Sequence, residues 1–523
     1  MKIFITIVLG ILYTLCFAPF HLFAAGFISF TGLLLILDSL NSPKKAFWYG
    51  FLFAFAHHVS GLYWISYSML VEPEKFAWMI PFTVSVIPAY LSLYVGAVCW
   101  LTYKFNFKKI NRILFFASMW TLAEMARSYL FTGFPWNLTG YVFLTKLTIA
   151  QTASYISVYG LSLIAIILFC SPHFAARYIK NSTRAPIYKY SLSLYYLIPI
   201  ILLLVQLSNL GSRRIDINKS EFEKINIRIV QPNIPQKEKF DPLRIGDHLF
   251  KFYNLTLSDG KDADYVPDLI VWPEASVTTN LADDHEFMTE IADIIPYSAY
   301  LILGSVRQEG WMVNRKIFNS VQFVDSEGNL ETNHYDKAHL VPFGEYVPLR
   351  KLLPFVNKLA NGIGDFNKGD GPKTIKLANS PAFSPLICYE VIFPGMVVDK
   401  KNPNKPEWIL NVTNDAWFGN SSGPYQHLDA ARMRAIEEGL PVIRSANTGV
   451  SAVIDGMGRI LNYIKLNEEG VIDTKLPKNI AEETYYSKNG NKVPLILAAG
   501  IAILSLLLKY VSKVLSKGQP ELH

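Results

Sequence analysis

Residues 384–394 read Ser-Pro-Leu-Ile-Cys-Tyr-Glu-Val-Ile-Phe-Pro, which places Cys388 directly after a short apolar run. The other three of the four cysteines, Cys16, Cys99 and Cys170, lie inside long apolar segments. A lone thiol after an apolar run is more often a small buried hydrophobic residue than a nucleophile. A chemical role for Cys388 therefore depends on residues elsewhere in the chain.

The composition around this stretch indicates a membrane protein with a large polar domain. Of the 523 residues, 51% are hydrophobic and only 17% are charged, and the mean hydropathy is +0.23, which is too apolar for a soluble protein of this size. The apolar residues crowd into 1–210 and 493–511, and the segment between them has an ordinary globular composition. The net charge of +7 comes without a long Lys/Arg block, so we expect no nucleic-acid partner.

Eight apolar windows are close to the roughly 20 residues that a helix needs to cross the hydrocarbon layer. They are residues 2–19, 22–38, 46–70, 77–103, 111–130, 148–170, 190–208 and 493–511. The first window is also compatible with a cleaved signal peptide, but Leu15 before Cys16 does not fit a lipoprotein cleavage box, which has a small residue there. We therefore predict eight spans, with seven helices in a membrane domain at 1–210 and an eighth at 490–512.

The loop charges predict the orientation, because Lys and Arg near helix ends are retained on the cytoplasmic side. The loops after the second, fourth and sixth windows carry Lys44, Lys45, Lys104, Lys108, Lys109, Arg112, Arg177, Lys180, Arg184 and Lys189. The alternate loops are poor in Lys and Arg. We therefore expect both termini in the cytoplasm, including a cytoplasmic tail at 513–523, and an extracytoplasmic domain at 220–485.

The predicted compartment bears on Cys388. Extracytoplasmic compartments favour disulfides, yet a domain that holds a single cysteine does not use them for stability. The presence of a single free thiol in such a domain therefore favours a chemical role for Cys388 over a structural one.

Several polar residues lie within the predicted membrane domain. His57 and His58 fall inside the third window, where an ionisable group is a functional candidate, although a place near one helix end or at a polar cavity is the simpler explanation. Glu124 and Arg127 are three residues apart on one helix face, so we expect a local ion pair. Trp136, in the following loop, is either an interfacial anchor or a contact for a lipid substrate.

The extracytoplasmic domain alternates short strands and helices. Strands are predicted at 225–231, 267–272, 299–304, 317–324, 385–388, 408–412 and 450–455, and helices at 241–257, 283–294 and 425–438. Mixed strands and helices over this length indicate a layered α/β sandwich.

Three polar constellations stand at or beyond the ends of predicted strands. They are Trp-Pro-Glu-Ala-Ser at 272–276, Tyr-Asp-Lys-Ala-His-Leu-Val-Pro-Phe-Gly-Glu-Tyr-Val-Pro at 335–348, and Cys-Tyr-Glu at 388–390. Taken singly, Glu274 and Lys337 read as solvated surface charges. Together with Cys388 they form a chemically complete set for acyl transfer, with a base, a charge stabiliser and a nucleophile. Such a set needs no metal, and the histidines lack ligand spacing, so we expect neither a metal site nor a cofactor.

These segments resemble the signatures of the nitrilase (carbon–nitrogen hydrolase) superfamily, whose catalytic residues are Glu, Lys and Cys in that chain order. The string after Lys337 and the Asn-Val-Thr-Asn-Asp-Ala-Trp-Phe-Gly run at 411–419 resemble more narrowly the bacterial apolipoprotein N-acyltransferases. The resemblance covers essentially the whole chain, without a departure at the catalytic positions. It implies an αββα nitrilase-like domain outside a bundle of eight membrane helices, in a multi-pass protein of the bacterial inner membrane with a periplasmic catalytic domain.

The resemblance also implies that Cys388 takes an acyl chain from a phospholipid as a thioester. Cys388 then passes the chain to the α-amine of the diacylglyceryl-modified N-terminal cysteine of an apolipoprotein. Glu274 is expected to be the base, since a thiol with a pKa near 8.5 must lose its proton to attack an ester. Lys337, with a backbone N–H near Cys388, is expected to stabilise the tetrahedral oxyanion. The supporting residues are Glu345, which orients Lys337, and Tyr389 and Glu390, which shape the pocket, with a structural role for Glu390 left open.

Two further features each have two interpretations. Residues 349–371 combine apolar side chains with four glycines, which suits a mobile lid that excludes water but also an ordinary surface loop. Trp417 and Phe418 either line the entrance for the acyl chain or the lipoprotein, or belong to the core.

Two rival functions remain at this point. A membrane-tethered amidase or nitrilase would hydrolyse a small extracytoplasmic substrate, with water resolving the acyl-enzyme, although seven preceding spans exceed what an anchor needs. A lipid-binding or transport protein without catalysis predicts a broken triad, whereas Glu274, Lys337 and Cys388 are all present.

Overall fold

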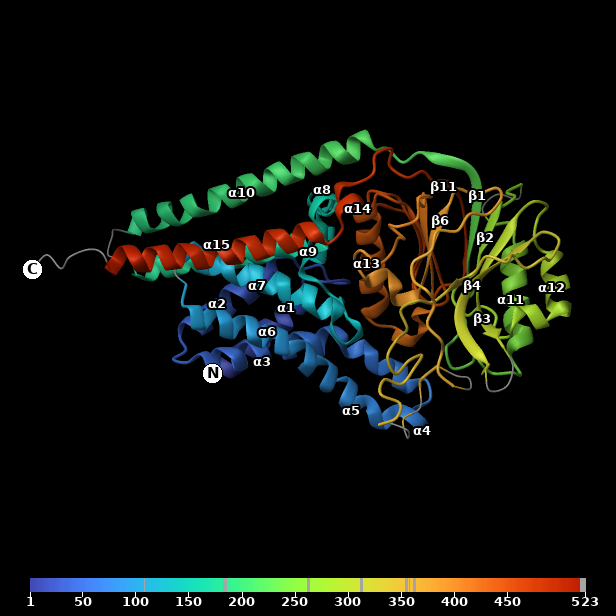
Figure 1. The fold of residues 1–523 in the computed structure, drawn as a ribbon, viewed down its shortest axis with the longest axis horizontal. Coiled ribbons are helices and arrows are strands. Elements are labelled where there is room, and N and C mark those ends of the chain that lie inside the picture. The colour runs from blue at the N-terminus through green and yellow to red at the C-terminus, as the bar shows by residue number, and fades with distance from the viewer. Residues whose placement is uncertain are drawn as a thin grey trace, which may run out of the picture. The chain divides into compact units, whose positions relative to one another are not determined.

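The structure is a computed structural model that describes residues 1–107, 109–181, 186–260, 264–310, 314–352, 356, 358–360 and 364–517. The chain folds into two compact units (Figure 1). A helical unit comprises Met1–Tyr63, Pro81–Ile217 and Thr484–His523, and an α/β unit comprises Trp64–Ile80 and Asn218–Glu483. Most of the predicted tail at 513–523 lies outside the described residues.

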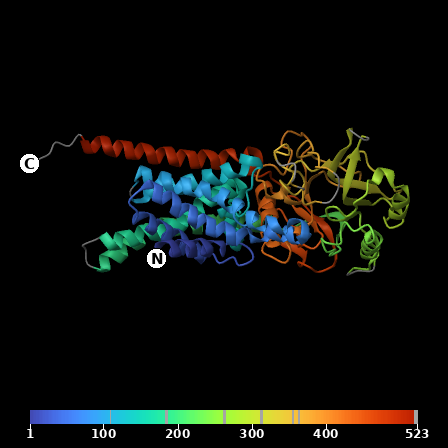
Figure 2. The same ribbon diagram turned by 90° about the horizontal axis from the view of Figure 1, so that it is seen from below.

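Each predicted apolar window holds one long helix of the helical unit. The helices are α1 (Lys2–Thr14), α2 (Ala24–Asp38), α3 (Pro43–Leu62), α6 (Val86–Phe105), α7 (Lys109–Tyr129), α9 (Ala153–Asn181), α10 (Pro186–Ile217) and α15 (Lys492–Lys517). Figures 1 and 2 show these helices running side by side. By length and composition, 4 segments of the described chain are able to cross a membrane, namely Pro73–Phe105, Ala153–His173, Ile198–Ile217 and Lys492–Val511. The count of eight spans therefore stays a prediction.

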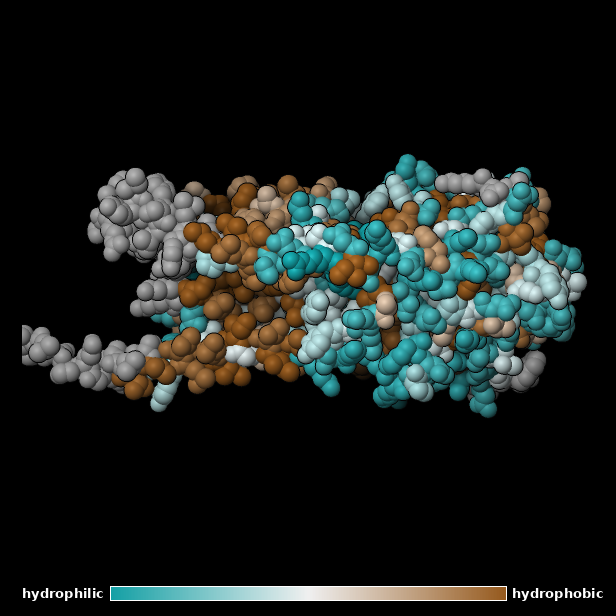
Figure 3. Space-filling view, turned by 90° about the horizontal axis from the view of Figure 1, so that it is seen from above, coloured by the Kyte–Doolittle hydropathy of each residue, from teal (hydrophilic) through white to brown (hydrophobic). Residues whose placement is uncertain are grey.

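The surface of the helical unit is largely apolar, whereas that of the α/β unit is largely polar (Figure 3). On α10 and α15, Leu202 is 62% exposed, Ile496 69% and Leu507 56%. Long apolar faces of this kind are unfavourable in water and suit contact with lipid. The apolar composition of the chain therefore resides in an outward-facing helical surface as well as in a core.

Close helix contacts in this unit depend on glycine. Gly10 of α1 meets the carbonyl oxygen of Phe53 in α3, and Gly50 of α3 meets Cys99 of α6, so that a Cβ at either glycine would overlap its neighbour. Cys99 is thus a packing residue, and Cys16 and Cys170 are buried in the same way. Cys16, Cys99 and Cys170 belong to the helical unit, whereas Cys388 belongs to the α/β unit.

His57 and His58 line a small cavity of about 20 Å³ in the helical unit. His57 Nδ1 lies 2.9 Å from Thr14 Oγ1, and His58 Nδ1 lies 3.3 Å from Ser92 Oγ. Both rings are therefore satisfied by hydroxyl groups of neighbouring helices. A functional role for His57 or His58 stays a prediction.

The predicted ion pair between Glu124 and Arg127 is wrong. Glu124 Oε1 accepts from the Thr139 hydroxyl at 2.6 Å and from Trp120 Nε1 at 3.2 Å. Arg127 Nη2 instead donates to the carbonyl oxygen of Trp136 at 2.9 Å. The loop after α7 offers both side chains buried partners, and these replace the local i, i+3 contact that the spacing alone predicts.

The α/β unit holds two sheets in the described residues. The six-stranded sheet has the order β11-β1-β2-β3-β4-β5, with β1 (Phe222–Gln231), β2 (Leu269–Val271), β3 (Tyr300–Glu309), β4 (Lys316–Asp325), β5 (Tyr335–Asp336) and β11 (Gly470–Pro477). The five-stranded sheet has the order β10-β9-β8-β7-β6, with β6 (Phe383–Ile387), β7 (Trp408–Thr413), β8 (Val442–Ala446), β9 (Ser451–Ile454) and β10 (Ile460–Ile464). The sheets face each other, since Ser445 Oγ donates to the carbonyl oxygens of Val230 at 3.2 Å and Val271 at 3.3 Å.

Helices cover the outer face of each sheet, so the layers run helix, sheet, sheet, helix (Figure 1). On one side, α11 (Ile245–Leu257) and α12 (His285–Ala292) pack on the six-stranded sheet. The ring of Phe252 in α11 stacks on Trp272 with centroids 4.5 Å apart. On the other side, α13 (Gly423–Glu438) packs against β8. This is the layered α/β sandwich that the sequence predicted.

The loops that contain Glu274 and Cys388 both begin at the carboxyl end of a parallel strand. Strands β1, β2 and β3 are parallel neighbours, as are β6, β7 and β8. Glu274 and Cys388 each follow the carboxyl end of one of these strands. In open parallel sheets, ligands bind in the crevice outside these carboxyl ends.

Four strands, β5, β8, β10 and β11, were not predicted from the sequence. Strand β8 illustrates why, because its Arg444 and Ser445 are fully buried and break the apolar pattern that marks a buried strand. The predicted strand at 385–388 ends one residue early, since Cys388 already begins the next element.

The third window was predicted to run to residue 70, but α3 ends at Leu62. The segment Trp64–Ile80 belongs to the α/β unit. There Trp64 Nε1 donates to Gln426 Oε1 at 3.2 Å, and the Trp64 ring lies 4.5 Å from that of Phe418. These contacts join residues that are far apart in the sequence, so local hydropathy does not predict them. Because of them, the chain leaves the helix after Leu62.

Candidate active site

Cys388 sits on a sharp elbow. It is the first residue of the 3₁₀ helix η7 (Cys388–Ile392), which follows β6 directly. Its φ is 54°, a left-handed conformation that costs a non-glycine residue roughly 1–2 kcal/mol. Strain of this kind persists only where the surroundings hold it. The elbow places the thiol at the end of the strand, with 6% of the residue exposed.

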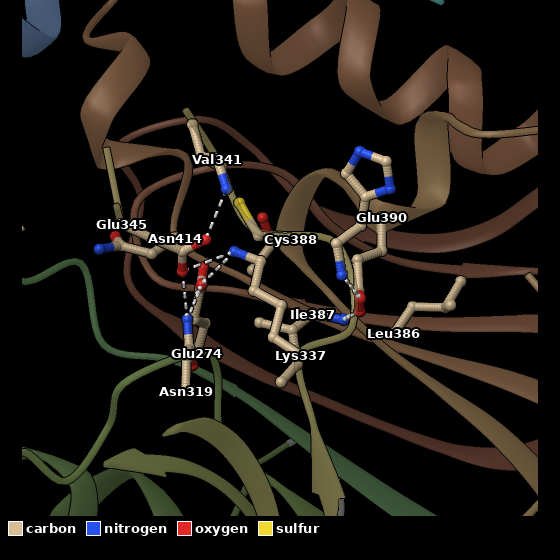
Figure 4. Close-up of polar contacts among 12 residues, drawn as sticks. Glu274, Asn319, Lys337, Val341, Glu345, Leu386, Ile387, Cys388, Glu390 and Asn414 are labelled. Atoms are coloured by element: carbon tan, nitrogen blue, oxygen red, sulfur yellow. Dashed lines mark hydrogen bonds and ion pairs between the residues drawn. The ribbon is translucent and has the colours of Figure 1, made fainter. Parts of the chain in front are cut away.

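The three predicted catalytic residues come together around Lys337 (Figure 4). Glu274 follows β2, and Lys337 follows β5. The Lys337 ammonium lies 3.3 Å from Glu274 Oε1 and 3.0 Å from Glu345 Oε1. Figure 4 shows this ammonium beside the Cys388 side chain. The carboxylate, ammonium and thiol that were predicted from separate motifs thus form one cluster.

Asn319 of β4 is a member of this cluster that the motifs did not reveal. Its Nδ2 donates to Glu274 Oε1 and to Glu345 Oε1, at 2.8 Å in both cases. The two carboxylates therefore share one amide as well as the Lys337 ammonium. A single asparagine in the middle of a strand has no sequence signal, because only the fold brings it to the two acids.

The charges of the cluster keep Lys337 protonated and the thiol neutral. Burial by itself lowers the pKa of Lys337, but the Glu274 and Glu345 carboxylates raise it well above its ordinary value. Burial and the Glu274 carboxylate raise the pKa of Cys388, and Lys337 opposes them only in part. The thiol therefore needs a base at the moment of attack, and Glu274 Oε2 is buried without a hydrogen-bond partner among the described residues.

Lys239 is a second buried lysine beside the site that the sequence analysis missed. Its Nζ donates to the main-chain oxygen of Glu274 at 2.8 Å. Burial lowers the pKa of Lys239 to about 8, against the opposing pull of Glu274 and Cys388. The residue lies in the loop after β1, where a lysine among other charged residues has no pattern that marks it as buried.

Glu390 is a structural anchor of the elbow. Its carboxylate accepts main-chain N–H groups from Ile387 at 2.8 Å, Ala338 at 2.8 Å and His339 at 2.9 Å, and also the Tyr335 hydroxyl at 3.0 Å. Burial raises the pKa of Glu390 to about 7, although these hydrogen bonds and Lys337 work against the rise. The Glu390 carboxylate thus connects Ile387, just before Cys388, with Ala338 and His339, just after Lys337. This favours a structural role for Glu390 over a role in shaping the pocket.

Tyr389 lies buried next to Cys388 in the chain. Its ring packs edge-on against Phe393, with centroids 5.1 Å apart, and lies 5.5 Å from the His339 ring. Its hydroxyl has no hydrogen-bond partner among the described residues. A role of Tyr389 in shaping the pocket stays a prediction.

The three residues predicted to contact substrate lie in different units, with Trp136 in the helical unit and Trp417 and Phe418 in the α/β unit. Trp136 is buried in the helical unit, stacked on Phe134 with centroids 5.8 Å apart. Trp417 and Phe418 belong to η8 (Asp415–Phe418), which follows β7. Phe418 packs on Trp64 and on His427, with ring centroids 4.5 and 5.8 Å apart. Phe418 is half-buried, and substrate contact by Trp136, Trp417 and Phe418 stays a prediction.

The predicted lid at 349–371 is described only in part, because residues 353–355, 357 and 361–363 lie outside the described residues. Leu349 and Leu352 are 71% and 72% exposed, whereas Val356 is buried. The end of the segment is bonded to the loop that contains Lys337, since Gly369 N donates to the Lys337 carbonyl oxygen at 2.9 Å. A closing motion of this segment stays a prediction.

Comparison with known proteins agrees with this site. Residues 9–171 match the family model described as "Apolipoprotein N-acyltransferase N-terminal domain", and residues 258–486 match "Carbon-nitrogen hydrolase". The chain is 36% identical over 521 residues to the apolipoprotein N-acyltransferase of Rhodopseudomonas palustris, covering 97% of this chain and 95% of that protein. It is also 36% identical over 511 residues to that of Rickettsia prowazekii, covering 97% and 98%. The resemblance predicted from the sequence motifs is confirmed.

Proposed function

Because this chain belongs to the apolipoprotein N-acyltransferase family, we propose that it acylates lipoproteins through a thioester on Cys388. The acyl donor is a phospholipid. The acceptor is the α-amine of the diacylglyceryl-modified N-terminal cysteine of an apolipoprotein. The observation that carries the mechanism is the position of the Lys337 ammonium, between two carboxylates and beside the thiol.

In the first half-reaction, Cys388 Sγ attacks the ester carbonyl carbon of the phospholipid while Glu274 takes the thiol proton. A concerted transfer suits a thiol whose pKa burial has raised. The C–S bond forms, the ester C–O bond breaks, and Glu274 returns the proton to the departing oxygen of the lysophospholipid. Cys388 then carries the acyl chain as a thioester.

The charges in the cluster favour this step. When Glu274 becomes protonated, Lys337 loses one of its two anionic partners, and the new oxyanion takes the place of that negative charge. Glu345 still holds the ammonium at 3.0 Å. A charge that is already oriented before reaction stabilises the oxyanion without reorganisation, and one such donor is typically worth about 2.7–4 kcal/mol.

In the second half-reaction, the acceptor amine attacks the thioester. An α-ammonium group has a reference pKa of about 7.7–8.0, so part of it must lose a proton near neutral pH. Glu274 is the base that takes this proton. Glu274 passes this first proton to solvent. As the C–N bond forms and the C–S bond breaks, Glu274 takes the second N–H proton from the attacking nitrogen and returns it to the sulfur of Cys388.

The substrates point to a location at a membrane. We propose a multi-pass protein of the bacterial inner membrane with eight spans, a periplasmic catalytic domain and both termini in the cytoplasm. The basic loops after the second, fourth and sixth windows support this orientation. The exposed apolar faces of α10 and α15 support the spans. Protease added to spheroplasts is expected to cut near Asn361, which lies outside the described residues, and cleavage near Lys180 with protection at Asn361 would invert the topology.

The mechanism is tested with the full-length protein and a phospholipid that carries a labelled acyl chain, without acceptor. A hydroxylamine-sensitive label on Cys388 that survives in water is expected. Cys388→Ala is expected to remain in the membrane and to take up no label. A diacylglyceryl peptide with a free α-amine should discharge the label, whereas the same peptide with an acetylated α-amine should not.

The other outcomes separate the rival functions. Continuous release of free fatty acid, with no stable label, would support a membrane-tethered hydrolase. Absence of any adduct would support a binding protein. Transfer by Cys388→Ala would refute the thioester.

A further inference from the structure

The peptide group between Cys388 and Tyr389 is gripped at its carbonyl oxygen. Asn411 Nδ2 of β7 lies 3.2 Å from this oxygen, and His427 Nε2 of α13 also lies 3.2 Å from it. Because a carbonyl oxygen only accepts, Nε2 carries the hydrogen at this contact. Two side chains from two separate elements thus hold one peptide group next to the nucleophile.

The side chains of Asn411 and His427 are themselves held by hydrogen bonds to buried Arg444 and Asp415. His427 Nδ1 lies 2.8 Å from Asp415 Oδ1. Arg444 Nη2 donates to Asp415 Oδ2 at 2.6 Å, and Arg444 Nη1 donates to Asn411 Oδ1. Asn411, Asp415, His427 and Arg444 are all 0% exposed. A buried polar cluster is rigid when its members are satisfied, so the two donors have fixed positions.

The ionic state of the cluster is set by the arginine. Burial by itself raises the pKa of Asp415, but the Arg444 guanidinium and His427 hold it below its ordinary value. The carboxylate is therefore charged and accepts a hydrogen bond from Nδ1 of His427. Since Nε2 also donates, the ring is protonated at both nitrogens, a form that Asp415 favours while burial and Arg444 lower the pKa of His427. The Phe418 ring, 5.8 Å from the His427 ring, closes the cluster on one side.

The two hydrogen bonds to the carbonyl oxygen of Cys388 also determine the direction of the N–H of Tyr389 in the same peptide group. A trans peptide is planar, so the N–H of Tyr389 points opposite to the carbonyl oxygen of Cys388. This N–H has no hydrogen-bond acceptor within the described chain. It is the backbone N–H that follows the nucleophile, on the elbow where φ of Cys388 is 54°.

We propose that His427 and Asn411 are positioning residues that fix the Cys388–Tyr389 peptide so that the Tyr389 N–H faces the oxyanion of the tetrahedral intermediate. The proposal rests on the thioester mechanism proposed above. The left-handed elbow is strained, and without the two donors this peptide is free to rotate toward an unstrained conformation. The oxyanion would then keep Lys337 but lose its backbone donor.

Two reactions of the same thiol test the proposal. Acylation of Cys388 by a phospholipid forms an oxyanion, whereas alkylation by iodoacetamide does not. His427→Leu is expected to slow single-turnover acylation by about 10²-fold, the lower end of the effect of losing one oxyanion donor. The alkylation rate is expected to stay within about threefold, which also reports that the elbow and the base are intact. His427→Gln, which can place an N–H near the Nε2 position, is expected to recover part of the acylation rate.

The controls separate the possible failures. Arg432→Gln alters a side chain of the same helix that bonds Asp429 and the Gly458 carbonyl oxygen instead, and it should change neither rate. Equal loss of acylation and alkylation in His427→Leu and His427→Gln would mean a merely structural role, and unchanged acylation would also overturn the proposal. Absence of an acyl adduct in the unaltered protein would refute the thioester mechanism itself, which is a different result.

Discussion

The Lys337 ammonium lies 3.0 Å from Oε1 of Glu345, eight residues further along the same loop. The other oxygen of Glu345 accepts the main-chain N–H of Val341 at 2.9 Å. The carboxylate is therefore fixed by its own loop, and it holds the lysine independently of Glu274. In the proposed reaction this second anchor matters, because the negative charge of Glu274 is lost when that residue takes a proton.

Replacement of Glu345 by glutamine should slow acylation of Cys388 more than it weakens phospholipid binding. The substitution keeps the shape but removes the charge that holds Lys337 once Glu274 is protonated. We expect a fall of about 10–100-fold in the single-turnover rate, below the full loss of an oxyanion donor. Glu309→Gln is the charge-matched control, since Glu309 pairs with Arg307 on β3. Equal rates for both variants would remove Glu345 from the mechanism.

Replacement of Glu390 by glutamine should destabilise the α/β unit. The carboxylate accepts three main-chain N–H groups on its two oxygens, and a carboxamide turns an N–H₂ group toward at least one of them. A buried unsatisfied donor costs about 1–3 kcal/mol. Thermal denaturation of the detergent-solubilised protein should show a lower midpoint than Glu407→Gln, which alters an exposed carboxylate. Matching midpoints would mean that these hydrogen bonds contribute little.

The pKa of Lys239 predicts a dependence of stability on pH. Burial lowers this pKa to about 8, below the ordinary value of 10.5 that applies in the unfolded chain. Between about pH 8 and 10.5 the unfolded state therefore binds more protons, and this residue's contribution to stability rises with pH, by at most about 3 kcal/mol. Comparison of denaturation midpoints at pH 8 and pH 10 should show a smaller rise in Lys239→Met than in the unaltered protein.

Lys237→Met provides the control for this effect, because Lys237 is exposed on the same loop. Its midpoints should follow those of the unaltered protein at both pH values. A rise in Lys239→Met as large as in Lys237→Met would show that Lys239 does not carry the pH dependence.

Removal of the Trp64 side chain should loosen the loop that contains Trp417 and Phe418. The Trp64 ring packs on Phe418, and its Nε1 bonds Gln426. Loss of a buried Trp typically costs about 3–5 kcal/mol. Hydrogen exchange in residues 415–419 should become faster in Trp64→Ala but not in Trp78→Ala, since Trp78 of the same segment is 55% exposed. Unchanged exchange in Trp64→Ala would contradict the assignment of this segment to the α/β unit.

Much of the architecture followed from patterns that are local in the sequence. Long apolar windows marked the eight helices, since length and hydropathy are properties of consecutive residues. The alternation of short strands and helices marked the layered sandwich in the same way. Glu274, Lys337 and Cys388 stood out because each belongs to a recognisable motif at the end of a strand.

The parts that the sequence did not predict depend on contacts between distant residues. Asn319 and Lys239 have no motif of their own, and only strand pairing and burial bring them to Glu274. Trp64 looked like part of a membrane span until its contacts with Gln426 and Phe418 placed it in the α/β unit. Hydropathy is calculated from neighbouring residues in the sequence, so it does not predict contacts with distant residues.

The sequence by itself determined the chemistry available to this protein, because side-chain type and motif order name a base, a cation and a thiol. Tertiary structure alone decided how they are used. It set the 3.0 and 3.3 Å distances of Lys337 from its two carboxylates, and it buried Cys388, which raises the pKa of the thiol and keeps it neutral. The physical reason is that charge interactions and burial depend on distances through space, which the order of residues does not contain.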